Sequence, residues 1–138
     1  MVCVALAASV MASGALASGP RLSESAYRAK ATAICVDLNR YQVPATKPFV
    51  DGMQGALEKT RSAVSALAGL EPPVSLVTTH QLAIQAESKL VADFAALLAR
   101  VRNHTLTPQK MIAALGTNAH ARSGAVLWRR LGVPACAQ

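Results

Sequence analysis

The chain has 138 residues, of which 52% are hydrophobic and only 4% aromatic, and its formal net charge is +7. This length allows one domain with a real core. The scarcity of aromatic side chains argues against binding nucleic acid by base stacking. An aliphatic, alanine-rich composition is typical of helix bundles, because alanine and leucine have high helix propensity.

The first 17 residues carry no charge and have the pattern of an export signal. Their apolar run ends in Ala15-Leu16-Ala17, a small-x-small cleavage pattern, and is shorter than the roughly 20 residues that span a membrane. We expect residues 1–17 to be a signal peptide that is cleaved after Ala17 and residues 18–138 to be a helical bundle domain. The protein would then be secreted or extracytoplasmic, in a bacterial cell envelope.

The basic residue that normally begins a signal peptide is missing, since the first basic residue is Arg21. Either translation starts upstream or the signal is weak. An uncleaved membrane anchor and a cytosolic chain therefore remain as alternatives. Val2 stands before Cys3 where a lipid-modified cysteine would need a small residue, so lipid anchoring is disfavoured.

Prolines divide the rest of the chain into four segments with helical periodicity, and none lies inside a segment, where it would cost roughly 3 kcal/mol. We expect helices over residues 23–41, 48–68, 74–102 and 107–131. In the first three, mostly apolar residues at steps of three, four or seven form one stripe. These positions are Tyr27, Ala31, Ile34, Leu38 and Tyr41; Val50, Met53, Leu57, Thr60, Val64 and Leu67; then Leu76, Ala83, Leu90, Phe94, Leu97 and Val101.

The fourth segment has the clearest start signal and the weakest middle. Thr107 is placed to cap a helix, and Pro108 suits its first position. Residues 116–124 are small and polar and are bracketed by glycines, so a kink or a break is expected there. Its apolar stripe is expected at Ile112, Leu115, Val126, Leu127 and Leu131.

These elements predict an all-α fold, an antiparallel up-down-up-down four-helix bundle. Removal of the signal peptide also removes Cys3, and an even number of cysteines in an exported chain favours a disulfide. We expect Cys35 and Cys136 to form it, since the tail need only fold back along the first helix. The bridge would close a loop of 101 residues, worth about 4–5 kcal/mol as an upper estimate in the chain-entropy model.

Three short motifs are spread along the mature chain, one in the first helix, one between the second and third helices, and one at the end. They are Tyr27-x-x-x-Ala31-x-x-Ile34-Cys35, Leu67-x-x-Leu70-x-Pro72-Pro73 and Leu131-Gly132-x-x-x-Cys136.

With these motifs the chain resembles a group of small exported α-helical proteins of high-GC bacteria, most of them uncharacterised. The resemblance covers the whole mature chain and implies the bundle and the disulfide. It implies no catalytic residues, because none are established for that group. Many of its members are lipoproteins, and this chain departs from them because it lacks a lipobox.

The sequence offers no catalytic residue, cofactor site or metal site. The three histidines, His80, His104 and His120, have no ligand partner three or four residues away, as a helical metal site would need. Motifs for covalent haem, for a serine nucleophile and for phosphate binding are missing. The exported helical mutases of the chorismate type use arginine and lysine spacings that have no match here.

We therefore expect a non-enzymatic, exported helical bundle that serves as an envelope-associated or interaction module. All charged residues follow Ala17, so the mature domain keeps its +7 charge and its affinity for anionic membrane or cell-wall surfaces. The alternative without a binding partner is that the positive charge serves only to keep the protein soluble. The other functional alternative is a carrier or enzyme for a small ligand or anion, with a groove near Glu87 and Lys89 formed by Asn118, His120 and Arg122.

Overall fold

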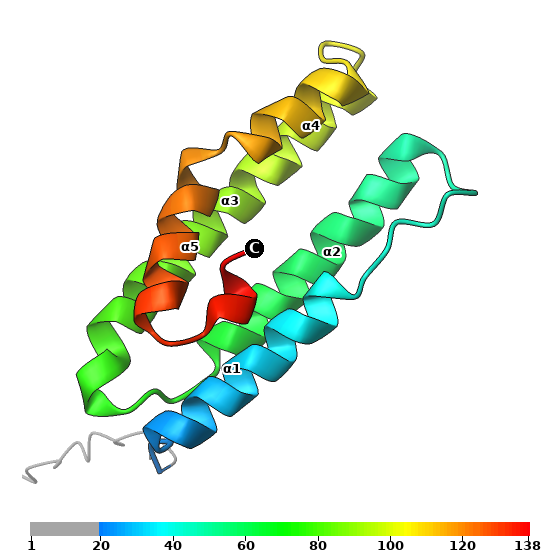
Figure 1. Ribbon diagram of the computed structural model, residues 1–138. Helices are drawn as coiled ribbons and strands as arrows, with labels where there is room; N and C mark the ends of the chain where they lie inside the picture. Colours follow the sequence, from blue (N-terminus) through cyan, green and yellow to red (C-terminus); the bar gives the residue numbers. More distant parts are fainter. Residues whose placement is uncertain (1–19) are drawn as a thin grey trace, which may run out of the picture.

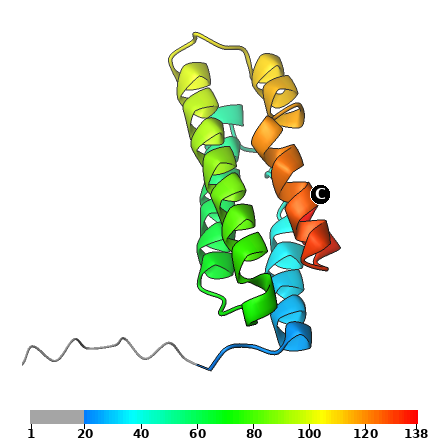
Figure 2. The same cartoon turned by 90° about the vertical axis from the view of Figure 1, so that its left-hand side faces the viewer.

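A computed structural model describes residues 20–138 and has an all-α fold, so the predicted fold class is confirmed. The predicted signal peptide, residues 1–17, lies outside the described residues. Helices α1, α2 and α3 alternate in direction, and α4 and α5 both run back along α3; both views show α3 and α5 side by side (Figures 1 and 2). The helices are α1 (Glu24–Asn39), α2 (Phe49–Ala68), α3 (Val77–Arg102), α4 (Pro108–Gly116) and α5 (Ala119–Arg130), with single 3-10 turns at η1 (Val74–Leu76) and η2 (Pro134–Cys136).

Two helices start at the caps that the sequence predicts. The Ser23 hydroxyl accepts a hydrogen bond from the Ala26 amide at 3.2 Å, and Thr107 accepts one from the Lys110 amide at 3.3 Å. Pro108 occupies the first turn of α4. Each cap satisfies an amide that has no partner within its helix, which fixes the residue at which the helix begins.

The fourth helix is broken at the polar segment where a kink or a break is expected. Gly116 ends α4, and Asn118 adopts an extended conformation with φ −62° and ψ 129°. The Asn118 side chain accepts hydrogen bonds from the amides of His120 and Ala121 at 2.8 and 3.1 Å. Asn118 is thus the N-cap of a new helix, and α5 takes its own rotational phase relative to α3.

This break explains why the predicted apolar stripe of the fourth helix is partly wrong. Ile112 is 56% exposed and Val126 46% exposed, whereas Met111 and Trp128 are fully buried. The predicted stripe keeps one rotational phase across the segment in which a kink or a break is expected. Because α4 and α5 are separate helices, each turns a different set of positions toward the bundle.

The core consists of two clusters along the bundle. One lies where the tail meets the first helix, and the other joins the start of α2, the end of α3 and α4. Two alanines, Ala31 and Ala83, lie among larger side chains that fill most of the interior. The buried members are Tyr27, Ala31, Cys35, Leu67, Ala83, Trp128, Leu131 and Val133 in the first cluster, and Leu57, Phe94, Leu98, Val101 and Met111 in the second.

The chain reverses after α5 and returns to α1, where Cys35 and Cys136 form the predicted disulfide (Figure 1). Gly132 makes the reversal with φ +75°, a conformation that favours glycine, and the Val133 amide donates to the Trp128 carbonyl at 2.9 Å. The Asn39 side chain donates to the Ala135 carbonyl at 2.8 Å. The tail is therefore held to α1 by hydrogen bonds as well as by the bridge.

Candidate functional site

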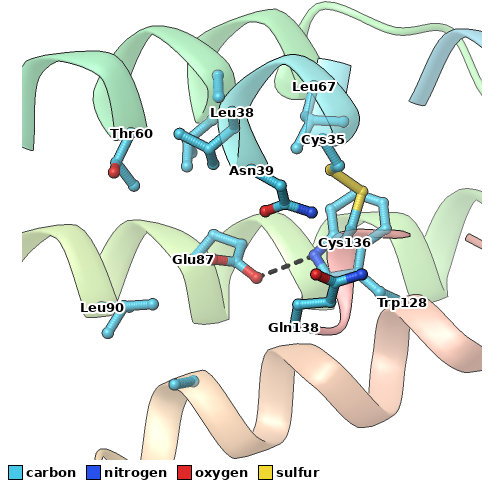
Figure 3. A pocket seen from close by; sticks show the side chains of 13 residues that line it. Cys35, Leu38, Asn39, Thr60, Leu67, Glu87, Leu90, Trp128, Cys136 and Gln138 are labelled. Carbon is cyan, nitrogen blue, oxygen red and sulfur yellow. Dashed lines mark hydrogen bonds between the residues drawn. A yellow bond between two sulfur atoms is a disulfide. The ribbon is translucent and has the colours of Figure 1, made fainter. Parts of the chain in front are cut away.

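A cavity of about 130 Å³ lies between α1, α2, α3, α5 and the tail (Figure 3). Most of its wall is apolar, formed by side chains such as Leu38, Val64, Leu67 and Leu90 together with the disulfide. Polar groups reach it from Asn39, Thr60 and Gln138. An apolar cavity with a few polar groups has the general form of a small-molecule site.

Glu87 is the one ionisable side chain that lines this cavity among the described residues. Its Oε1 accepts a hydrogen bond of 2.9 Å from the indole nitrogen of Trp128 (Figure 3). Burial raises the pKa of the Glu87 carboxyl, and the hydrogen bond from Trp128 partly opposes that effect. Glu87 is thus a half-buried carboxyl group, and its burial disfavours the charged form.

The glycine at position 124 makes room for this carboxylate. Gly124 is buried in α5, and a Cβ atom there would lie 2.7 Å from Glu87 Oε1. A side chain at this position would therefore displace the carboxylate from the indole of Trp128. The sequence pattern marked glycine here only as a weak point in the helix, and the contact with Glu87 depends on packing between α3 and α5.

A second polar pair lies deeper in the core. The Tyr27 hydroxyl and His80 Nδ1 form a hydrogen bond of 2.8 Å, and the His80 ring meets the Trp128 ring edge-on with centroids 6.2 Å apart. Burial lowers the pKa of His80, opposed by Glu71, and raises the pKa of Tyr27 to about 12. Both groups are therefore neutral near pH 7 and act as a hydrogen-bonded part of the core.

The three residues of the predicted groove take different positions. The Asn118 amide donates to Asp93 Oδ2 at 2.9 Å, and His120 Nε2 lies 3.9 Å from the same oxygen. Arg122 is exposed and does not line the cavity. Of the residues in this segment, Ala121 lines the cavity. The structure therefore brings Asn118 and His120 together around Asp93, while Arg122 lies apart from them.

A second hollow, of about 290 Å³, lies at the α3–α4 hairpin. Arg100, His104 and Lys110 line it, all three are exposed, and no carboxylate among residues 20–138 contributes to its lining. The turn that shapes it is well bonded, because the Arg100 carbonyl accepts from the amides of Thr105 and Leu106. His104 adopts φ 58°, a left-handed conformation that is uncommon for residues other than glycine.

Among residues 20–138 no group of three or more His, Cys, Asp or Glu side chains could hold a metal ion. No helix in the same range is long and apolar enough to cross a membrane. Comparison of the chain with protein families, with curated proteins and with solved structures finds no match. The fold and these two sites therefore carry the functional argument.

Proposed function

We propose that the protein is an exported helical bundle that attaches to anionic surfaces of the cell envelope through its α3–α4 hairpin. The observation that carries the proposal is the hollow lined by Arg100, His104 and Lys110, to which no carboxylate of residues 20–138 contributes. Positive side chains gathered at one end of a small domain attract phosphate groups of lipids or of acidic wall polymers. Export is supported by the apolar segment that ends at Ala17 and by a disulfide, which persists in oxidising compartments.

The distribution of ion pairs supports the choice of the hairpin. Arg28 pairs with Glu24, and Lys59 pairs with Asp37, so part of the positive charge along α1 and α2 is neutralised within the fold. At the hairpin end Arg102 instead donates a hydrogen bond to an uncharged group on α2, the Gln54 side chain, at 3.2 Å.

The α1–α2 connection reaches the same end of the bundle and brings Lys47 with it (Figure 1). Asp51, in the first turn of α2, adds one negative charge at this end. Arg100, Arg102 and Lys110 are exposed there together with Lys47, so the positive charges outnumber this carboxylate.

The expected attachment is peripheral and reversible. A lysine or arginine near an anionic leaflet contributes about 1 kcal/mol, so Arg100 and Lys110 together contribute about 2 kcal/mol. Attraction of this kind falls as salt shortens the Debye length from about 30 Å at 0.01 M to about 8 Å at 0.15 M. Binding should therefore be strong at low salt and weak at physiological salt.

Co-sedimentation with vesicles tests this proposal. The parent protein should pellet with phosphatidylglycerol vesicles at low salt and stay in the supernatant with phosphatidylcholine vesicles. A variant with Arg100→Gln and Lys110→Gln should lose most of the binding. The matched control replaces Arg129 and Arg130 by glutamine, which removes the same charge at the opposite end of the bundle. This control should bind as weakly as the hairpin variant only if net charge, rather than the hairpin, governs attachment.

Two outcomes contradict the proposal: no binding to anionic vesicles or acidic wall extract at low salt, or equal losses of binding in the two double variants.

Export is tested separately by intact mass and thiol labelling of protein recovered from the native host. The expected result is a chain that lacks residues 1–17 and has no free thiol.

A second candidate function is binding of a small molecule in the bundle. The observation that favours it is the cavity beside Ala121, next to the segment where the sequence predicts a ligand groove. Because the ionisable group in this cavity is the carboxyl of Glu87, the cavity does not suit an anion. The class of ligand that it suits is argued below.

A further inference from the structure

The cavity that Glu87 lines combines apolar walls with one carboxylate side chain among residues 20–138. We propose that this cavity binds a small organic ammonium ion, with Glu87 as its counter-ion and the apolar walls around its hydrocarbon part. The inference rests on the second candidate function above and is independent of attachment through the α3–α4 hairpin.

The first argument is the missing positive partner. No lysine, arginine or histidine side chain from α1, α2, α3, α5 or the tail lines the cavity. Among residues 20–138 the structure records one hydrogen bond to the Glu87 side chain, from Trp128 to Oε1. Carboxylates removed from water are normally paired, so a cationic ligand would supply the partner that the described fold does not.

The second argument is that the carboxylate is held at a fixed place. Trp128 is fully buried and donates its only polar hydrogen to Oε1, while Gly124 keeps the neighbouring turn of α5 free of a side chain. A neutral acceptor such as glutamine would satisfy the indole equally well. Satisfying Trp128 therefore does not by itself account for an ionisable group in this position.

The third argument is size. A cavity of about 150 Å³ in another protein takes one benzene molecule, and the cavity here measures about 130 Å³. The enclosed hydrocarbon part of the ligand should therefore have at most about six non-hydrogen atoms, as one benzene ring has, with its ammonium group beside the half-buried Glu87. Trp128 also lines the cavity, and aromatic rings attract ammonium groups.

The test uses the purified mature protein titrated with benzylammonium chloride, benzyl alcohol and sodium benzoate. Trp128 is the only tryptophan of the chain, so its fluorescence reports the cavity directly, and calorimetry gives the affinity. Benzylammonium should bind about tenfold or more tightly than benzyl alcohol, because a charge-assisted contact is stronger than a neutral one. Benzoate should bind more weakly than both.

Two variants and a control locate the effect. Glu87→Gln keeps an acceptor for Trp128 and should reduce benzylammonium binding to the level of benzyl alcohol. Gly124→Ala keeps the charge but displaces it, and should weaken benzylammonium binding several-fold while circular dichroism shows an intact fold. Glu58→Gln removes an exposed carboxylate of α2 and should leave all affinities unchanged.

Equal affinity for benzylammonium and benzyl alcohol, or unchanged benzylammonium binding in Glu87→Gln, would overturn the ammonium assignment and leave an uncharged apolar site. If Glu87→Gln does not fold, unchanged binding in Gly124→Ala overturns it in the same way. Absence of binding by every probe would overturn the second candidate function as well. None of these results bears on vesicle binding by the hairpin.

Discussion

Replacing both bridge cysteines by alanine is expected to lower the free energy of unfolding by up to about 4.7 kcal/mol. The bridge joins residues 101 positions apart, and the chain-entropy model assigns about that value to a loop of this length. Domains of this size have total stabilities of about 5–15 kcal/mol, so the loss would be a third or more of the whole. The native contacts around the tail, including the hydrogen bond from Asn39 to Ala135, remain available to the variant.

The expected fall in melting temperature follows from the length of the folded part. Unfolding entropy is about 2.1 cal/mol/K per residue near 60 °C, which gives about 0.25 kcal/mol/K for residues 20–138. A loss of 4.7 kcal/mol then corresponds to a fall of roughly 15–20 °C. Thermal and urea unfolding followed by circular dichroism measures both quantities.

The parent protein under reducing conditions is the control, because it loses the bridge but keeps the sulfur atoms. It should fall by nearly the same amount as the double alanine variant. A loss below about 1 kcal/mol in both would refute the loop-entropy reasoning. A large loss in the alanine variant alone would show that packing of the buried Cys35 side chain, rather than the bridge, provides the stability.

Four further predictions concern the buried polar groups and the second core cluster. Burial raises the pKa of Glu87, so the folded state keeps this proton to a higher pH than the unfolded state, and the free energy of unfolding falls as pH rises above 4.5. In urea titrations Glu87→Gln should lack this fall and should be the more stable protein at neutral pH. Burial lowers the pKa of His80, so the unfolded chain binds this proton before the folded protein does as pH drops below 6.5. The free energy of unfolding should therefore fall below pH 6.5 in the parent protein and not in His80→Gln. The same fall in the variant would show that His80 is not the group responsible. Tyr27→Phe should lower the free energy of unfolding by about 1–3 kcal/mol, because it leaves His80 without its hydrogen-bond partner. Leu98→Ala should lower it by about 2–5 kcal/mol, because Leu98 is 1% exposed. A loss below about 1 kcal/mol in urea unfolding would contradict either value.

The sequence predicts the architecture well where local rules operate. Proline positions, the caps at Ser23 and Thr107 and the glycine-bracketed segment lead to the observed helices and to the break, because each acts within a few residues along the chain. The disulfide follows from cysteine number and helix direction together. These are properties that a single sequence contains.

The sites depend on contacts between distant residues, which no local pattern specifies. The hydrogen bond between Tyr27 and His80 joins positions 53 apart, and that between Glu87 and Trp128 joins positions 41 apart. Gly124 is read from the sequence as a weak helix position, yet its role is to admit a carboxylate from another helix. The relative rotation of the packed helices decides such contacts, and for Glu87 and Trp128 the break before α5 resets that rotation.

The bridge between Cys35 and Cys136 also makes most of the folded chain a closed covalent ring. Residues 35–136 form the ring, which contains α2, α3, α4 and α5, while the first two thirds of α1 lies outside it. A protease that cuts an exposed connection such as residues 41–48 would open the ring but release no fragment. A nicked molecule would therefore remain one covalent unit and could keep its packed helices until a reductant reached the bridge.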